Sequence, residues 1–463
     1  MRIASIIRLS LACIAISLLH LAAFPQLIAA GGYHSLALCA DGTVQSWGNN
    51  GSGELGNGSN TSMNHPVPVN ALTDVAALAP GLGAHSLAVR TDGTAWAWGS
   101  NGAGQLGNGA NVDSNVPVQV SGLGNVATAA IGYGYSHAVK DDGTVWSWGS
   151  NGYGELGNGS NVPSNFPVQV SGLTNVERVG AGWGHSVALR TDGTVVTWGS
   201  GIYGELGNGG NVDSNVPVEV SALTNVTAIA SGRAHCLAVK DDGTVWAWGA
   251  NTYGALGDSS YTNRNVPVHV NGLTSVVAVA AGQYFSLALK SDGSVWAWGQ
   301  NNYGMLGNGG TTDSNEPVQV PALTDVVAMA AGEFHVLVVK ADGTAWAWGS
   351  NSTGALGNNT FTESHVPVQV QDLCVLNTSV SAIARPQYLA IHPNPTTGLS
   401  MVDYPTAGIR ELIMQDAMGR PIPQPRSING RWLIDLSAQP SGVYVCIART
   451  EEGNRITARV IRE

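Results

Sequence analysis

The stretch DDGTVWAWG at residues 241–249 decides the fold, because seven versions of it recur along the chain. Close copies lie at residues 91–99, 141–149, 291–299 and 341–349, and looser copies lie at residues 40–48 and 191–199. The Trp-Gly pair in each copy recurs after 51 residues once and after 50 residues thereafter. A period of this length is typical of a solenoid or a propeller, and 463 residues exceed what one ordinary core holds.

One repeat, residues 226–270, contains four short apolar segments: VTAIA, HCLAVK, VWAWG and VPVHV. Each fits a β-strand, and the Asp-Gly pair between the second and the third is typical of a tight hairpin. A longer loop, NTYGALGDSSYTNRN, joins the third segment to the fourth. With no helical period in the chain, the sequence predicts an all-β fold: a seven-bladed β-propeller over residues 24–373, with repeats of about 50 residues.

The two tryptophans of VWAWG have a structural explanation. Trp246 and Trp248 are two residues apart, so they project from one face of the strand, whereas Val245 and Ala247 project from the other. Stacked blades bury both faces of each sheet, so we expect the indoles to fill the wedge between neighbouring blades. A side chain that every blade repeats is a packing device rather than a ligand contact.

The longer pattern GAGWGHSVALRTDGTVVTWGSGIYGELGNG, residues 180–209, closely resembles the regulator of chromosome condensation repeat family, and the resemblance extends over about residues 26–373. It implies the seven-bladed propeller but does not settle activity. Members of that family include a nuclear nucleotide-exchange factor, a plant ultraviolet receptor and a secreted bacterial β-lactamase inhibitor. The acidic propeller and the predicted export signal argue against the nuclear role, and the few arginines of the repeats argue against the light-sensing role.

Charge is distributed unevenly along the chain, whose net charge is −11. Residues 31–373 carry 9 Lys or Arg against 24 Asp or Glu, a net charge of −15, whereas residues 374–463 carry 9 Arg against 7 Asp or Glu, a net charge of +2. A propeller of this sign is unsuited to the phosphate backbone, which argues against nucleic-acid binding.

The N-terminus is typical of a secretory signal peptide, which we place at residues 1–23. Two arginines precede an apolar run from Leu9 to Ala23, and Pro25 follows. The run is too short for a transmembrane span. Cleavage is expected after Ala23, with LIAA at residues 27–30 as a later alternative. Removal of the signal leaves Cys39, Cys236, Cys374 and Cys446, whose pairing stays open because four cysteines over this length define no disulfide framework.

After Leu373 the period stops. We assign residues 374–387 to a linker and residues 388–463 to a small β-sandwich. Within the linker, VSAIA at residues 380–384 is similar to the first strand of a blade and would help to close the ring if LIAA is lost with the signal. HPNPTTG (392–398), DAMGRPI (416–422) and IDLSAQPSGVYVCI (434–447) resemble the type A C-terminal sorting domain of the type IX secretion system of Bacteroidetes. The resemblance implies translocation across the outer membrane, removal of the domain, and either release or attachment to surface lipopolysaccharide. The tail carries Arg455, Arg459 and Arg462 where the family commonly ends with Lys. An ordinary accessory sandwich is the alternative.

A histidine or an aromatic residue begins the second strand of each repeat: His34, His85, Tyr135, His185, His235, Phe285 and His335. A metal ion needs three or four ligands around one point, whereas these residues belong to separate blades, so we expect hydrogen-bonded structural histidines and no metal. The recurring set exemplified by His85, Ser86 and Asp92 superficially contains a hydrolase triad. Adjacent residues on one strand point to opposite faces, so we expect His85 and Ser86 not to meet.

Other polar residues also favour structural roles. Glu54, Glu155 and Glu205 occupy equivalent loop positions, and we interpret them as solvated loop acids rather than a glycosidase pair. The Asn, Asp and Gly runs at residues 108–115, 208–215 and 308–315 lack the spaced carboxylates of a calcium loop, so they predict turns. We therefore expect no catalytic residue, no cofactor and no enzymatic activity.

The turn between the first and second strands lies at the same end of a blade as the long loop between the third and fourth. The candidate ligand-binding residues at that end comprise Tyr133, Trp183, Arg233, Tyr284 and Phe334 from the turns and Tyr153, Tyr203, Tyr253 and Tyr303 from the loops, with Tyr33 nearby. Flat rings beside amides suit a sugar or a peptide. The regular recurrence of the four loop tyrosines leaves repeat packing as their alternative role, whereas Trp183, Arg233 and Tyr284 vary from blade to blade.

These observations predict a secreted or cell-surface, non-enzymatic binding protein, exported by the type IX machinery, whose propeller presents a surface for a glycan or a protein. The alternatives are a secreted propeller enzyme, such as a polysaccharide lyase or a glycosidase, and a secreted protein inhibitor.

Overall fold

A computed structural model describes residues 27–378, except 80 and 322, and residues 390–392, 399–403, 409–416, 420–422, 425–428, 431–450 and 455–462. The chain divides into two units, Met1–Val380 and Ser381–Glu463. The boundary between the units falls inside the segment that we assigned to the linker. The predicted signal peptide, residues 1–23, lies outside the described residues.

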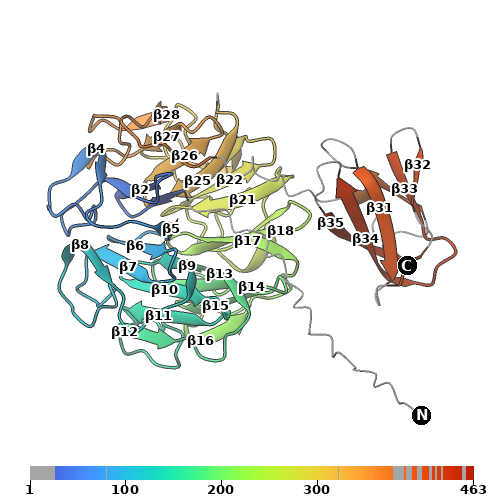
Figure 1. The fold of residues 1–463 in the computed structure, drawn as a ribbon, viewed down its shortest axis with the longest axis horizontal. Helices are drawn as coiled ribbons and strands as arrows, with labels where there is room; N and C mark the ends of the chain where they lie inside the picture. The colour runs from blue at the N-terminus through green and yellow to red at the C-terminus, as the bar shows by residue number, and fades with distance from the viewer. Residues whose placement is uncertain are drawn as a thin grey trace, which may run out of the picture. The chain divides into compact units, whose positions relative to one another are not determined.

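The first unit consists of seven four-stranded antiparallel sheets, each made of four consecutive strands, and they form the seven blades of a propeller (Figure 1). Blades 1 and 2 contain β1 (Ile28–Ala30), β2 (His34–Leu38), β3 (Val44–Gly48) and β4 (Met63–Pro68), then β5 (Val75–Leu78), β6 (His85–Arg90), β7 (Ala95–Gly99) and β8 (Ser114–Gln119). Blades 3 and 4 contain β9 (Val126–Ile131), β10 (Tyr135–Lys140), β11 (Val145–Gly149) and β12 (Ser164–Gln169), then β13 (Val176–Ala181), β14 (His185–Arg190), β15 (Val195–Gly199) and β16 (Ser214–Glu219).

Blades 5 and 6 contain β17 (Val226–Ser231), β18 (His235–Lys240), β19 (Val245–Gly249) and β20 (Arg264–His269), then β21 (Val276–Ala281), β22 (Phe285–Lys290), β23 (Val295–Gly299) and β24 (Ser314–Gln319). Blade 7 contains β25 (Val326–Ala331), β26 (His335–Lys340), β27 (Ala345–Gly349) and β28 (Ser364–Gln369). The described residues include no helix, so the predicted all-β propeller is confirmed.

The Asp-Gly motif forms the hairpin between the second and third strands, as predicted. In blade 5, Val239 pairs with Val245, which leaves a tight turn between them. Gly243 has a φ of 76°, in the region that favours glycine. The Asp242 carboxylate accepts hydrogen bonds from the backbone N–H of Thr244 at 2.9 Å and from its hydroxyl at 2.6 Å. The turn is therefore fixed by short local bonds that the sequence specifies.

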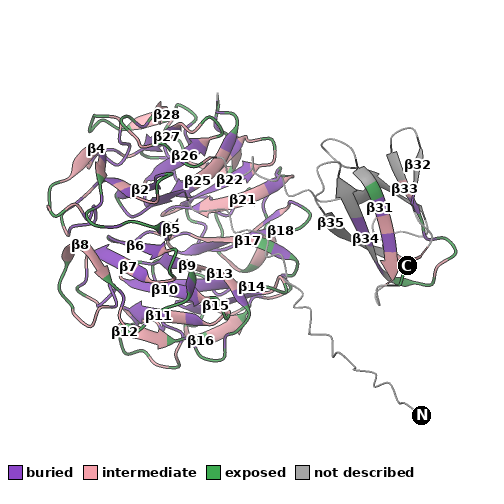
Figure 2. Ribbon diagram, in the orientation of Figure 1, coloured by how far each residue is buried: buried purple, intermediate pink, exposed green. Residues whose placement is uncertain are grey.

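The second tryptophan of each pair lies between blades. Trp248 is fully buried, and its Nε1 donates a hydrogen bond to the Glu205 carbonyl of the preceding blade at 2.8 Å. The equivalent tryptophans are also fully buried: Trp47, Trp98, Trp148, Trp198, Trp298 and Trp348. Figure 2 shows the buried residues concentrated along the strands of the blades. Trp246 is only half-buried, because its ring lies against Lys240 and the hairpin, so the expectation that both indoles fill the wedge holds fully for Trp248 alone.

The ring closes between blades 7 and 1. β1 pairs with β2 and packs against β25 and β26, so LIAA supplies the first strand of blade 1, and a replacement by VSAIA is not needed. Cys374 forms a disulfide with Cys39 across a sequence separation of 335, and its N–H donates to Gln45 Oε1 at 2.7 Å. Leu376 forms a bridge with Cys39. Residues 374–376, which we assigned to the linker, thus belong to the closure of the propeller.

The second unit contains two small antiparallel sheets. One has the order β29 (Ala390–His392), β30 (Leu399–Asp403), β33 (Arg431–Asp435) and β32 (Arg426–Ile428), and the other has the order β31 (Ile409–Asp416), β34 (Gly442–Thr450) and β35 (Arg455–Arg462). Leu412, Met414 and Cys446 are buried. The strands were expected, whereas the packing of the two sheets as a sandwich stays a prediction. Across the described part of the chain, no helix could span a bilayer.

Candidate functional site

The histidines at the start of the second strands join neighbouring blades. His85 Nε2 lies 2.8 Å from Ser136 Oγ of the next blade, and Ser136 Oγ donates to the Gln105 carbonyl at 2.8 Å. The serine proton is used by that carbonyl, so the imidazole N–H donates to the serine oxygen. Four more interfaces have the same kind of bond: His34 to Ser86, His137 to Ser186, His235 to Ser286, and His335 to Ser35. Between blades 4 and 5, Cys236 takes the place of the serine, and His185 Nε2 lies 2.8 Å from Ser231 Oγ and 3.2 Å from Cys236 Sγ.

These bonds confirm that the histidines are structural. We expected His85 and Ser86 not to meet, and each instead bonds to a residue of a neighbouring blade. Burial lowers the pKa of His85 to about 3, so the imidazole is a poor base near neutral pH. Among the described residues no group of three or more His, Cys, Asp or Glu could hold a metal ion. The His–Ser pairs therefore stabilise the ring and provide no nucleophile.

Two blades depart from the pattern in a matched way. Blade 3 has Tyr135 at the histidine position, and His137, two residues further on, makes the bond to the next blade. Blade 6 has Phe285 there, and the facing position of blade 7 is Val336 instead of serine; both belong to one apolar cluster. At each of these interfaces, a polar side chain of one blade faces a polar side chain of the next, and an apolar side chain faces an apolar one. Comparison of successive repeats in the sequence could have revealed this pairing.

The interpretation of the three glutamates as solvated loop acids is wrong. Glu54, Glu155 and Glu205 are 2%, 2% and 3% exposed. Their carboxylates accept hydrogen bonds from backbone N–H groups of the same loop, for example from Tyr203 to Glu205 Oε2 at 2.7 Å. Burial raises the pKa of Glu205 to about 7. The residues shape the long loop, and their burial was not apparent from the sequence because Gly and Asn are the commonest residues of that loop.

The Asn, Asp and Gly runs form turns, as predicted. Asn101 Nδ2 donates to the carbonyls of Ala110 and Val112, and its backbone N–H donates to Asp113 Oδ1 at 2.7 Å. The carboxylate of Asp113 is thus part of the loop's own hydrogen bonding.

We call the end of the propeller that carries the strand one–strand two turns and the long loops the mouth. Ring contacts show that turns and loops meet there, because the loop of one blade packs against the turn of the next. Centroid distances are 5.9 Å for Tyr153–Trp183, 5.1 Å for Tyr253–Tyr284 and 5.3 Å for Tyr303–Phe334. Tyr133–Trp183 at 6.0 Å and Tyr33–Phe334 at 5.8 Å join the turns themselves. Three of the four loop tyrosines therefore take part in packing, whereas Tyr203 makes no ring contact in the described structure.

The rings remain accessible despite these contacts. Tyr133, Trp183 and Tyr203 are 52%, 38% and 50% exposed, and Tyr33 and Tyr303 are also exposed. Side-chain packing on one edge with exposure on another is the usual condition of an aromatic that can contact a ligand. The mouth thus gathers the predicted turn and loop residues into one aromatic belt.

Arg233 lies inside this belt. Its guanidinium carbon is 5.1 Å from the centroid of the Trp183 ring and 5.5 Å from that of the Tyr284 ring. The sequence brought these three residues together as candidates because they vary between blades, but it contained no sign that the arginine stacks on both rings. They form one cluster on three consecutive blades, 4, 5 and 6.

A chain of backbone hydrogen bonds fixes the turns at the mouth. Trp183 N–H donates to the Arg233 carbonyl at 3.0 Å, and Arg233 N–H donates to the Gly282 carbonyl at 3.2 Å. Similar bonds link Gln283 to Glu333 and Glu333 to Gly32. Side chains at these positions are therefore presented from a backbone that each neighbouring blade holds in place.

Glu333 is the acidic member of the mouth. It is 9% exposed, and burial raises its pKa, while the nearby Tyr33 hydroxyl and Arg233 oppose that rise. Burial and the Glu333 carboxylate raise the pKa of Tyr33 to about 12. Glu333 and Tyr33 thus interact with one another.

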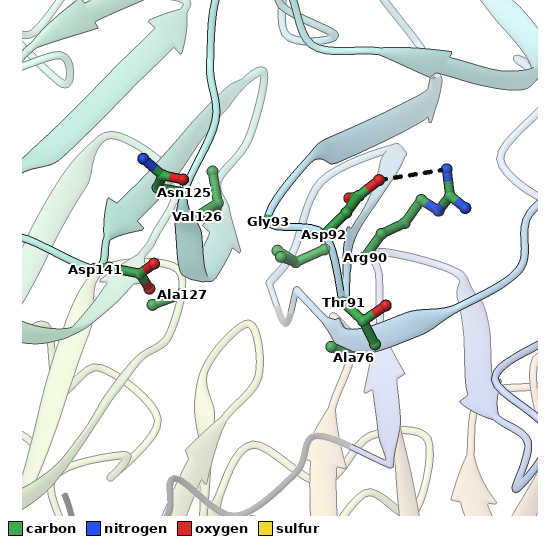
Figure 3. A pocket seen from close by; sticks show the side chains of 10 residues that line it. Ala76, Arg90, Thr91, Asp92, Gly93, Asn125, Val126, Ala127 and Asp141 are labelled. Carbon is green, nitrogen blue, oxygen red and sulfur yellow. Dashed lines mark ion pairs between the residues drawn. The ribbon is translucent and has the colours of Figure 1, made fainter.

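The opposite end carries the Asp-Gly hairpins and has a different character. A hollow of about 260 Å³ there is lined by Arg90, Thr91, Asp92, Asn125 and Asp141 among others (Figure 3). Arg90 is 3.1 Å from Asp74 and 3.8 Å from Asp92, so its charge is already compensated. The hollow offers polar hairpin groups and no aromatic side chain.

Seven blades, joined at six interfaces by histidine–serine hydrogen bonds and packed on buried tryptophans, with an aromatic mouth at one end, define a repeat propeller of the interaction-scaffold class. The chain belongs to the RCC1-like domain family: the family model of that domain matches residues 83–388, and models of the regulator of chromosome condensation repeat match residues 26–54 and 41–89.

Curated relatives match a quarter of the chain. The human "Probable E3 ubiquitin-protein ligase HERC6" is 43% identical over 116 residues, which are 24% of this chain and 11% of that protein. The Arabidopsis thaliana "Ultraviolet-B receptor UVR8" is 35% identical over 111 residues, 24% of this chain and 25% of that protein. The chain thus aligns with a quarter or less of the length of these relatives.

Solved structures match the propeller more fully. Human WBSCR16 superposes with a TM-score of 0.65 and 25% identity over 71% of this chain and 94% of that one. Prp20p from Saccharomyces cerevisiae superposes with a TM-score of 0.64 and 24% identity over 72% and 87%. These likenesses concern the fold.

Proposed function

We propose that this protein is an exported, non-enzymatic binding module whose propeller mouth recognises a protein partner outside the cell. The observation that carries the proposal is the Trp183–Arg233–Tyr284 cluster, set in an accessible aromatic belt. Aromatic residues and arginine are the side chains that most often dominate protein-binding surfaces.

The fold supports a protein ligand. RCC1-like propellers are protein-interaction folds, and the yeast propeller Prp20p binds Gsp1p and histones. The sign of the charge on this propeller argues against a nucleic-acid ligand.

The proposal that the protein is not an enzyme rests on the chemistry of the polar groups. The serines of the ring donate to carbonyls, the histidines have lowered pKa values, and the buried glutamates accept backbone hydrogen bonds. A secreted lyase or glycosidase needs a pair of positioned acid and base groups in a cleft, whereas Glu333 at the mouth is buried and interacts with the Tyr33 hydroxyl.

Export is proposed from the two ends of the chain. The N-terminal segment has the composition of a signal peptide, and residues 388–463 resemble a type IX sorting domain, which makes the type IX machinery the partner of that domain. The Cys39–Cys374 disulfide supports an oxidising compartment. A start of the mature chain upstream of Leu27 is required, because Ile28–Ala30 form the first strand of blade 1.

Two measurements test the proposal. Intact mass of the extracellular form in the native host should show loss of both ends; a species that retains Glu463 contradicts sorting-domain removal. Crosslinking on intact cells, followed by capture of the tagged protein, should recover one partner with the native chain and lose it with the Trp183→Ala/Tyr284→Ala variant. Equal recovery with both proteins would place the binding surface elsewhere.

A glycan is the second candidate ligand, because exposed rings with neighbouring amides also suit a sugar face. A glycan array probed with the native chain and the same double variant distinguishes the two. Glycan binding by the native chain, lost in the double variant and without a crosslinked protein partner, would favour this alternative.

A further inference from the structure

The guanidinium of Arg233 lies over two aromatic rings. The rings of Trp183 and Tyr284 lie at 5.1 and 5.5 Å from its central carbon. Within the described structure, the side chain of Arg233 makes no hydrogen bond and no ion pair with another residue. Trp183 is 38% exposed, so the cluster lies at the surface of the mouth.

This arrangement leaves the binding groups of arginine available. Stacking on aromatic rings uses the planar faces of the guanidinium, whereas its five N–H groups lie in the plane and point outward from the edge. Two of them match the two oxygens of a carboxylate in a bidentate pair. Because the rings limit the rotamers of the arginine before binding, less side-chain freedom is lost when that pair forms.

The charges around the cluster leave Arg233 as the cation that is open to a ligand. Arg264, at the start of β20, is paired with Asp258 at 2.9 Å. Glu333, whose pKa is raised by burial against the opposing charge of Arg233, is buried, and its carboxylate interacts with the Tyr33 hydroxyl. The propeller as a whole is strongly acidic. At the mouth of such an acidic body, a cation without an ion pair in the described structure fits one carboxylate among apolar neighbours better than a densely charged polyanion.

We propose that Arg233 binds a carboxylate of the protein partner, in an edge-on bidentate pair, while Trp183, Tyr284 and the adjoining rings contact apolar groups that flank it. The carboxylate comes from an Asp or Glu side chain or from a chain terminus. This inference rests on the proposed function, since it assigns a ligand chemistry to the same mouth.

The test uses the full chain and peptides. A random peptide library displayed on phage is selected against the native protein, and synthetic copies of the selected peptides are measured by fluorescence anisotropy. We expect the peptides to share one acidic residue with apolar neighbours, and Arg233→Gln to weaken their binding about thirtyfold, the scale of a lost charged pair. Asn or Gln in place of the peptide acid should give a similar loss, and combining both changes should add little. Arg264→Gln is the matched control and should leave binding unchanged.

Amidation of the peptide C-terminus separates the two sources of the carboxylate: it weakens binding if the terminus is recognised and has no effect if a side chain is. Binding that survives Arg233→Gln but is lost in the Trp183→Ala/Tyr284→Ala variant overturns the carboxylate inference and leaves the mouth as the binding surface. Peptide binding that is unchanged in both variants, or a selection that yields no binding peptide, overturns the proposed function as well.

Discussion

Loss of the Cys39–Cys374 disulfide should destabilise the propeller without opening it. The bond closes a loop with a sequence separation of 335, and the chain-entropy relation for a loop of that size gives about 6 kcal/mol at 25 °C. That figure is an upper limit, because disulfides commonly contribute about 2–4 kcal/mol. The interface of blades 7 and 1 also keeps the Trp47 Nε1 bond to the Ala355 carbonyl at 2.9 Å and the His335–Ser35 bond. We therefore expect Cys39→Ser/Cys374→Ser to lose about 2–4 kcal/mol of unfolding free energy.

Guanidinium unfolding followed by tryptophan fluorescence measures this change. Reductant should lower the midpoint of the native chain to that of the double variant and leave the variant unaffected. Cys236→Ser is the matched control, because serine occupies the equivalent position in most other blades and the buried Cys236 is free. It should behave as the native chain does in both conditions. An unchanged unfolding midpoint of the native chain on reduction would refute the conclusion that the disulfide stabilises the closed ring.

Three further predictions concern the mouth and the blade interfaces. The Trp183→Ala/Tyr284→Ala variant should lose partner binding while its melting temperature changes little, because both rings are partly exposed; a large drop in melting temperature would show that they are structural. His85→Phe and Ser136→Val should each lower the free energy of unfolding of the propeller by about 1–3 kcal/mol. The double variant copies the apolar pair of the interface between blades 6 and 7, so it should recover most of that loss in a double-mutant cycle. Additive losses would contradict the interpretation that the two facing residues are matched. Glu205→Gln should raise the melting temperature at pH 8 and change it little at pH 5. Burial raises the folded-state pKa of Glu205 to about 7, above the unfolded value, so the stability that the protonated carboxyl provides is lost as pH rises through 7. Equal shifts of the melting temperature at both pH values would contradict this reasoning.

The sequence predicts the fold well, because the determinants of a blade are local. The 50-residue period, the Asp-Gly turn and the alternation in VWAWG each act within a few residues, and blades contact mainly their neighbours. The tight turn at Gly243 and the burial of Trp248 therefore follow directly from the repeat.

Contacts between blades were harder to predict, because they join positions about 50 residues apart whose facing partner depends on how the sheets stack. The bond from His85 to Ser136, the burial of Glu205 and the return of Cys374 to Cys39 all belong to this class. The alternation rule correctly separated His85 from Ser86, but it contained no information about the next blade. The sequence likewise left the closing strand open between LIAA and VSAIA, because both segments are short and apolar.

The mouth shows how a repetitive fold acquires a specific site. In blades 3, 5 and 6 the loop tyrosine packs on the turn of the next blade, so one substitution there alters the platform shared by two blades. Blade 2 places Ala84 and Ala103 where other blades carry rings, and the loop of blade 1 has Ser52. The aromatic belt is consequently an arc over blades 3 to 7 that continues to Tyr33, rather than a closed circle, with Arg233 near its centre. A ligand that used only what all blades share would find seven equivalent positions, whereas a ligand that needs a stacked guanidinium finds one. Specificity therefore arises from the mouth residues that differ between blades, and the positions that all blades share supply the rigid backbone that presents them.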